Sequence, residues 1–155
     1  MTNAFSINEI KASFDTLFNT LEDYLFIIDE NGKVVHANKA AIEKLGYSPE
    51  ELEGVSLLLL HPPERRDEAA KIFASMMAGE RDHCPIPLYT KEGSCIPVET
   101  KVVRSQWQRK AVFLGICKDI SQISQANARF SKAFSINPAL MAISKIDSGE
   151  LIDVN

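Results

Sequence analysis

Three cysteines and three histidines offer the most reactive and metal-binding chemistry in this sequence. Paired thiols could form disulfides, and thiolates together with imidazoles could bind zinc. The cysteines are odd in number and include no CxxC pair; they are Cys84, Cys95 and Cys117. We therefore expect neither a disulfide framework nor a metal site, and we expect all three to be small buried residues of strands.

The histidines belong to no recognisable catalytic motif. Their sequence contexts are His36-Ala37-Asn38, His61-Pro62-Pro63 and His83-Cys84-Pro85. None has the acidic residue and downstream proline of a phosphoacceptor helix, and the chain lacks the GxGxxG and GxxxxGK[ST] phosphate loops. We expect His61 and His83 to be surface or capping residues and His36 to be partly buried in a strand. The chain itself is predicted not to be an enzyme.

The composition is that of a soluble globular protein, with 45% hydrophobic and 25% charged residues in a chain of 155. This length suits one domain with some flanking chain. The net charge of −4 argues against a nucleic-acid partner, which would favour a basic face. The most conspicuous apolar run, Leu57–Leu60, is far shorter than the ~20 residues that cross a bilayer, so we expect no membrane insertion. The N-terminus also lacks a signal-peptide pattern, and we expect a cytoplasmic location.

The elements that position these residues follow from the periodicity of the sequence. Asn31-Gly32 is a tight-turn dipeptide between two apolar runs. Asn38 and Ser48 stand where N-caps of two short helices are expected, with Glu51 at the capping-box position of the second. The predicted segments are strands over 24–29 and 33–37 and helices over 39–45, 49–53 and 64–78.

Three strands and a last helix are predicted to follow. Cys84–Tyr89 contains two prolines, which favour the edge of a sheet because proline cannot donate a ladder hydrogen bond. An alternating strand continues to Val102, Gln106–Lys110 is a polar turn, and Val112–Lys118 is a strand that is apolar on both faces. Ser121–Phe134 has helical spacing. The order predicts an α+β fold: a five-stranded antiparallel sheet with helices packed on one face, flanked by N- and C-terminal amphipathic helices.

The order and spacing of these segments resemble a PAS domain over roughly Asp15–Ile123. The stretches that carry the resemblance are IIDENGKVVHAN, LGYSPEELEG, LLLLHPPERRD, YTKEGSCIPVE and FLGICKDIS. The resemblance implies a PAS domain over 22–120, an N-terminal helix in 1–21 and a connector helix over 121–138. It implies a sensory input and dimerisation module of a signal-transduction protein.

Several outputs are compatible with such a module. We expect a sensor histidine kinase of a two-component system. The alternatives are a cyclic-di-GMP enzyme, such as a diguanylate cyclase, and a transcription regulator. A further alternative is a PAS domain that binds no ligand and serves only in protein interaction.

The cofactors found in relatives of this family are disfavoured. The position of the reactive cysteine of flavin-binding light sensors is Leu57 here, and Leu88, Val98 and Cys117 replace the polar amides that hold the flavin. Burying the polar edge of a flavin without partners would cost about 1–3 kcal/mol per group. The axial histidine of haem-binding relatives matches Glu68, and the predicted helix over 64–78 contains no histidine. We predict no cofactor.

An apolar cavity or a filled core remains, and both stay open at this point. If a ligand binds, it should be small and mostly apolar, for example a fatty acid or an aromatic. Alternation and the match to the family place the following residues around it: Phe26, Ile28, Val34, Ala41, Leu45, Leu57, Leu60, Phe73, Met76, Leu88, Val98, Thr100, Phe113, Gly115 and Cys117.

The N-terminal stretch carries a heptad stripe, whose apolar face must be buried against something. We expect a homodimer through this helix and the outer face of the sheet. The residues assigned to dimerisation and signal relay are Ile7, Ile10, Phe14, Leu17, Leu21 and Asp119.

The C-terminal stretch resembles an internal repeat of the first hairpin. Lys145-Ile146-Asp147, a Gly turn and Leu151-Ile152 match the order of Ile27-Ile28-Asp29, a Gly turn and Val34-Val35. We therefore expect 139–155 to be the truncated first hairpin of a second PAS domain, with output domains further downstream in the parent chain. Because a lone hairpin is marginal, we expect it to be disordered or to pair with a neighbour.

Overall fold

Short capped helices and antiparallel hairpins make up the fold. The computed structural model describes residues 6–136, 139 and 142–154. The helices are α1 (Ile7–Thr20), α2 (Lys39–Leu45), α3 (Pro49–Leu52), α4 (Arg66–Met77) and α5 (Ser121–Ile136), with 3-10 turns η1 (Leu57–Leu60) and η2 (Pro63–Arg65). The strands are β1 (Tyr24–Asp29), β2 (Val34–Ala37), β3 (His83–Cys84), β4 (Leu88–Tyr89), β5 (Cys95–Ile96), β6 (Val98–Trp107), β7 (Lys110–Asp119), β8 (Ala142–Ser144) and β9 (Leu151–Val154). Contacts divide the chain into two units, Met1–Asp119 and Ile120–Asn155.

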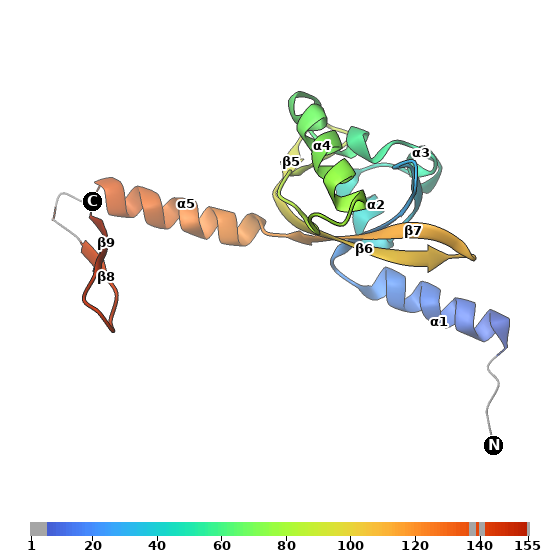
Figure 1. The fold of residues 1–155 in the computed structure, drawn as a ribbon, viewed down its shortest axis with the longest axis horizontal. Coiled ribbons are helices and arrows are strands. Elements are labelled where there is room, and N and C mark those ends of the chain that lie inside the picture. The colour runs from blue at the N-terminus through green and yellow to red at the C-terminus, as the bar shows by residue number, and fades with distance from the viewer. Residues whose placement is uncertain (1–5, 137–138, 140–141, 155) are drawn as a thin grey trace, which may run out of the picture. The chain divides into compact units, whose positions relative to one another are not determined.

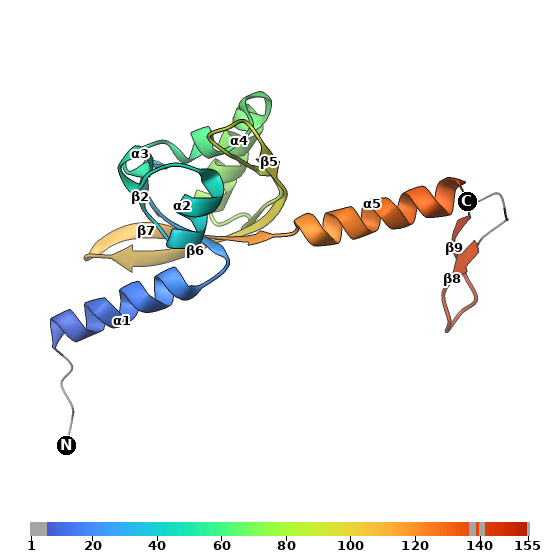
Figure 2. The same ribbon diagram turned by 180° about the vertical axis from the view of Figure 1, so that it is seen from behind.

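A five-stranded antiparallel sheet in the order β2-β1-β7-β6-β3 organises the first unit. Helices α2, α3 and α4 lie on one side of this sheet and α1 lies on the other (Figure 1, Figure 2). The longest ladder joins β6 to β7, and its turn consists of Gln108 and Arg109 with φ angles of 49° and 65°. Two successive left-handed residues match the twist of a two-residue hairpin. The α+β architecture predicted from the sequence is confirmed.

Side chains at the helix starts satisfy backbone groups that the helices themselves leave free. At α1, Ser6 Oγ accepts from the Glu9 amide at 3.3 Å and the Glu9 carboxylate accepts from the Ser6 amide at 2.7 Å. Ser48 and Glu51 form the same reciprocal pair at α3. Each capping box ties the first turn of its helix to the preceding chain. The helix start predicted at Ser48 is therefore confirmed.

The outer face of the sheet is covered in part by α1. Phe18 of α1 is buried against Leu25, Ile27 and Val112 of the sheet. Trp107, at the tip of the β6–β7 hairpin, folds back so that its ring lies 5.0 Å from the ring of Phe14, measured between centroids. The sheet of the same chain therefore buries part of the apolar face of α1.

The structure corrects several expectations for strands and turns. Cys84–Tyr89 is not one strand: β3 and β4 belong to different sheets, because Pro85 and Pro87 interrupt the ladder between them. β3 does occupy an edge of the five-stranded sheet. The predicted turn over Gln106–Lys110 is shorter, since the ladder continues to the pair Trp107 and Lys110.

Other corrections concern individual side chains. His36 is exposed on the outer face, where its ring stacks on Phe18 with centroids 5.3 Å apart, so it is not partly buried as predicted. His61 is buried and is not a surface residue. His83 is exposed, as predicted. Cys95 is exposed, whereas Cys84 and Cys117 are buried.

The second unit contains α5 and the β8–β9 hairpin. The hairpin pairs Ala142 with Val154 and Ile143 with Asp153, so β8 and β9 form a hairpin where disorder was one of two expectations; pairing with a neighbour stays a prediction. Its apolar side chains stay in solvent, with Ile146 fully exposed and Leu151 and Ile152 more than half exposed. Of the stretch 139–155, residues 140, 141 and 155 lie outside the described residues.

Asn38 connects α1, β1 and α2 through a single buried amide. Its Nδ2 donates to the carbonyls of Phe18 at 3.1 Å and Asp23 at 2.9 Å, with a longer contact to Leu21 at 3.4 Å. Its Oδ1 accepts from the amide of Leu25 at 3.0 Å and, as the N-cap of α2, from that of Ala41 at 3.1 Å. The side chain is 0% exposed, so no water could replace these bonds.

Replacing Asn38 with Ala should lower the free energy of unfolding by about 3 kcal/mol. Several buried backbone groups would lose their partner, and each costs about 1–3 kcal/mol when left unsatisfied. Urea denaturation followed by circular dichroism measures the effect. Asn31→Ala, at an exposed turn position, is the matched control and should change stability little. Equal stability of Asn38→Ala and wild type would contradict the role of the amide.

Candidate functional site

A small cavity lies between the inner face of the sheet and the segment that runs from η1 through α4. Its volume is about 40 Å³. The lining residues are Phe26, Ile28, Val34, Leu57, Leu60, His61, Ala69, Ile72, Phe73, Met76, Cys84, Leu88, Thr100, Val102, Gly115 and Cys117. No charged side chain is among them, so the cavity suits an uncharged and mainly apolar occupant.

The structure brings most of the predicted pocket residues together around this cavity. The predicted residues that line it are Phe26, Ile28, Val34, Leu57, Leu60, Phe73, Met76, Leu88, Thr100, Gly115 and Cys117. Four others are buried in the adjoining core and do not line the cavity: Ala41, Leu45, Val98 and Phe113. Ala41 and Leu45 belong to α2, which packs beside the cavity and not over it.

Five lining residues were not predicted: His61, Ala69, Ile72, Cys84 and Val102. Ala69 and Ile72 recur with Phe73 and Met76 at helical spacing along α4, a signal that could have identified them. Cys84 faces the cavity because it pairs with Thr100 on the inner face, and the alternation that runs back from Leu88 through Ile86 could have identified it. His61 is the C-cap of η1, so the capping expectation is confirmed, but no local signal in the sequence indicates that its ring is buried.

A row of residues crosses four strands on the inner face. Cys84 pairs with Thr100, Thr100 with Cys117, and Cys117 with Tyr24. The Thr100 hydroxyl donates to Cys117 Sγ at 3.1 Å. Burial raises the pKa of Cys117 to about 12, although the bond from Thr100 acts in the opposite direction. Burial also raises the pKa of Cys84, so both sulfurs are thiols at neutral pH and neither is an activated nucleophile.

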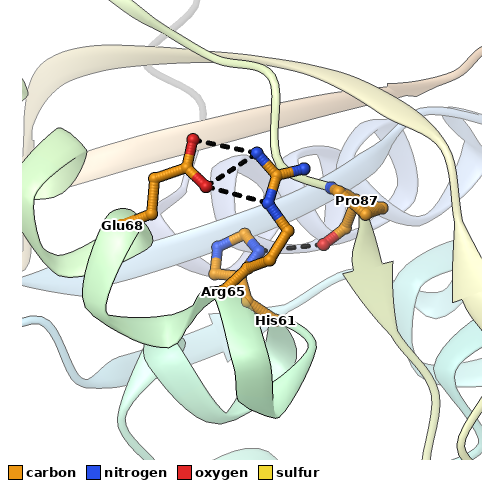
Figure 3. Close-up of polar contacts among 4 residues, drawn as sticks. All are labelled: His61, Arg65, Glu68 and Pro87. Carbon is orange, nitrogen blue, oxygen red and sulfur yellow. Dashed lines mark hydrogen bonds and ion pairs between the residues drawn. The ribbon is translucent and has the colours of Figure 1, made fainter.

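His61 is the one imidazole of the cavity wall, and only 6% of its surface is exposed. Its Nδ1 lies 3.0 Å from the Pro87 carbonyl oxygen (Figure 3). A carbonyl oxygen can only accept, so Nδ1 carries the proton and donates. Burial lowers the pKa of the ring, and the cations Arg65 and Arg66 add to this, while the bond to Pro87 works against it. The ring is therefore neutral at pH 7, with an unprotonated Nε2.

An ion pair covers the start of α4 near His61. Arg65 donates to both carboxylate oxygens of Glu68, at 2.9 Å from Nε and 2.9 Å from the terminal nitrogen (Figure 3). Arg66 donates to the His61 carbonyl oxygen at 3.2 Å. Arg65 thus pairs with a side chain of α4 and Arg66 with a backbone carbonyl, and neither arginine lines the cavity.

The residues assigned to dimerisation and relay occupy two settings. On α1, Ile7, Ile10 and Leu17 are exposed, as is Leu21 just after it, whereas Phe14 packs against Phe18 and Trp107. Asp119 ends β7 and accepts a hydrogen bond from the Tyr24 hydroxyl at 2.7 Å. Lys44 lies 3.7 Å from the same carboxylate.

The residues that the structure describes contain neither a cluster of metal-binding side chains nor a helix that could span a membrane. There, no three or more His, Cys, Asp or Glu side chains gather in a way that could hold a metal ion. Across the same residues, no helix has the combined length and apolar character needed to cross a bilayer.

Comparison with known families decides what kind of domain encloses this cavity. The sequence model of the PAS domain matches residues 22–122, which span the sheet and the helices on its inner face. This chain belongs to the PAS domain family. The resemblance noted in the sequence is thereby confirmed for the domain itself.

Solved PAS domains have the same fold. The PAS domain of a protein from Desulfitobacterium hafniense is 33% identical, with a TM-score of 0.62, and the match covers 67% of this chain and 98% of that one. The PAS domain of an HTR-like protein from Haloarcula marismortui is 22% identical, with a TM-score of 0.63, covering 74% and 94%. A domain of a sensory box sensor histidine kinase/response regulator from Geobacter sulfurreducens is 23% identical, with a TM-score of 0.60, covering 74% and 97%.

The pH dependence of stability should contain a contribution from His61. Its pKa is lowered in the folded state from the ordinary value of 6.5, so the unfolded chain takes up the proton first as the pH falls. The contribution is complete above pH 6.5 and is lost below it. Between pH 7.5 and 5.5, wild type should therefore lose more free energy of unfolding than His61→Phe, measured by urea denaturation. Above pH 7.5 the two curves should be parallel, and parallel curves down to pH 5.5 would contradict the assignment.

Proposed function

We propose that this PAS domain is a sensory input and dimerisation module whose input is a small, mainly apolar molecule. The observation that carries the proposal is the apolar cavity between the inner face of the sheet and α4. A cavity in this place touches β1, β6 and β7 together, so an occupant could alter the packing of the sheet that α1 contacts on its other face. The chain would act as a sensor and not as an enzyme.

Flavin does not fit the lining of this cavity. Leu88 lines it and Val98 lies beside it, and neither side chain can form a hydrogen bond to a flavin edge. Cys117 already accepts the bond from Thr100. A volume of about 40 Å³ is also far below that of a three-ring system. We propose that no flavin is bound.

Haem fits no better. The position that matches the axial ligand of haem-binding relatives is Glu68, whose carboxylate is paired with Arg65 on the helix surface. α4 contains no histidine. We propose that the chain carries no cofactor and that only a small ligand enters.

We propose a sensor histidine kinase of a two-component system as the parent protein. The name of the Geobacter sulfurreducens protein, a sensory box sensor histidine kinase/response regulator, supports this output. A diguanylate cyclase and a transcription regulator are the alternatives. In each case α5, which follows β7 directly, would be the connector to a downstream domain in the cytoplasm.

A second PAS domain downstream is also part of the proposal. The β8–β9 hairpin repeats local features of β1–β2: each turn has a glycine in the left-handed region, with φ of 76° at Gly32 and 68° at Gly149. Each hairpin has a register shift, between Ile27 and Ile28 in one and Ile143 and Ser144 in the other. These shared irregularities support the internal repeat.

A PAS domain without a ligand, used only for protein interaction, is the second candidate. The small volume of the cavity, about 40 Å³, favours it. The two candidates differ in what an organic extract of the purified protein should contain, which mass spectrometry can decide.

Dimerisation should depend on the exposed side of α1. Leu17 is 69% exposed in the single chain, and a partner helix would bury it. We expect wild type to be a dimer by size-exclusion chromatography with light scattering, and Leu17→Glu to be a monomer because a carboxylate would be buried in the interface. Ala12→Glu adds the same charge on the opposite side of α1 and should remain a dimer. A monomeric wild type at high concentration would refute the interface.

Filling the cavity should reduce ligand uptake without unfolding the domain. A Cβ at Gly115 would lie 3.5 Å from the Ile28 side chain, which is an ordinary contact. We expect Gly115→Ala to raise the free energy of unfolding by about 0.4–1 kcal/mol and to copurify with less ligand, measured by mass spectrometry of an organic extract. Ser105→Ala, exposed on β6, is the control. Equal ligand content in all three proteins would contradict binding in this cavity, and an empty wild type would argue for the interaction module.

A further inference from the structure

The polar side chains of the cavity wall are those of His61, Thr100, Cys84 and Cys117. Thr100 already donates to Cys117 Sγ, and the thiols of Cys84 and Cys117 are weak hydrogen-bonding groups. The imidazole of His61 has its Nδ1 proton committed to the Pro87 carbonyl. Its Nε2 is left as an unprotonated nitrogen, the strongest acceptor among the side chains that line the cavity.

Nε2 has no hydrogen-bond partner among the described residues, although the side chain is 6% exposed. Every fully buried side-chain nitrogen or oxygen in the described chain does have a partner. Nε2 is therefore not completely buried. Figure 3 shows this ring edge on the side opposite the Pro87 carbonyl. His61 is among the residues that line the cavity, so the cavity is the space to which we assign this nitrogen.

The backbone carbonyl of Pro87 determines which nitrogen of His61 carries the proton. Pro87 is held between the buried residues Ile86 and Leu88, so its carbonyl is a rigid acceptor for Nδ1. A histidine held in this way presents Nε2 in one direction and one protonation state. A preorganised acceptor of this kind loses little entropy when a donor binds.

We propose that Nε2 of His61 is the polar anchor of the cavity and that the ligand is a small, uncharged, mainly apolar molecule with one N–H or O–H donor. This inference rests on the proposed function, because it assumes that the cavity receives a ligand. Apolar side chains hold the body of the ligand and His61 accepts its single donor. An aliphatic or aromatic hydrocarbon without a donor would leave Nε2 unsatisfied.

The volume limits the size of the ligand. About 40 Å³ is well below the ~150 Å³ of an apolar cavity that binds benzene. A five-membered ring is larger than this space, so its entry requires movement of a flexible wall residue. Met76 lines the cavity and, as an unbranched thioether, is the residue best able to move.

Pyrrole and furan form a matched pair of probes for this anchor. The two rings have almost the same size, but only pyrrole carries an N–H donor. Titration of the full chain, followed by NMR of the methyl groups around the cavity, gives both affinities. We expect pyrrole to bind about three- to tenfold more tightly than furan, the range of one hydrogen bond. We also expect the ¹⁵N resonance of His61 Nε2 to shift with pyrrole and not with furan.

Two variants test whether the preference for pyrrole over furan depends on His61. His61→Phe keeps an aromatic ring but removes the acceptor, and it should bind pyrrole and furan equally. His36→Phe changes a histidine on the outer face and should keep the wild-type preference for pyrrole. The comparison of the two probes in wild type stands even if His61→Phe does not fold.

The possible failures are distinguishable. If pyrrole and furan bind wild type equally, or if the Nε2 resonance does not move, the anchor is wrong although the cavity still receives ligands. If neither probe binds and organic extracts of wild type are empty, the proposed sensing function is wrong and the anchor with it.

Discussion

The amide of Asn38 is the constraint on which the arrangement of this domain depends. A side-chain amide has two donor hydrogens and one acceptor oxygen, and Asn38 directs all of them at backbone groups of α1, the loop after it, β1 and α2. Because these partners come from both ends of the first hairpin, the end of α1 cannot move relative to the sheet without breaking buried hydrogen bonds. The burial of Phe18 on the outer face follows from this fixed position.

The two faces of the sheet are coupled by the alternation of side chains along β1. Phe26 and Ile28 point to the cavity, while Leu25 and Ile27 pack with Phe18 of α1. The same strand therefore contacts the site and the helix, separated by the thickness of one backbone. Protein interiors are close-packed, so a change of volume on one face is passed to side chains on the other. A single strand, β1, is therefore enough to connect the cavity with α1.

The sequence predicted the fold better than the details of the cavity. Alternation, Asn-Gly and the serine and asparagine caps are local signals, and they identified the hairpins and helix starts. Pro85 and Pro87 indicated an edge but not the separation of β3 from β4, because that depends on how the chain crosses to another sheet. The inward turn of His61 depends on a carbonyl 26 residues later, at Pro87, which no local pattern reveals. Likewise, the fold of Trp107 onto Phe14 is a contact between distant segments.

The docking of α1 also restricts how two copies could associate. Phe14 packs against Trp107. Phe18 is buried against the sheet, and its carbonyl accepts a hydrogen bond from the Asn38 amide. Exchange of this helix between copies, as in domain swapping, would first uncover both aromatic rings and leave the amide without its partners. Ile7, Ile10 and Leu17 remain available on the other side of the helix. An association of two copies through these side chains would leave each copy with its own helix and the fold of each domain complete.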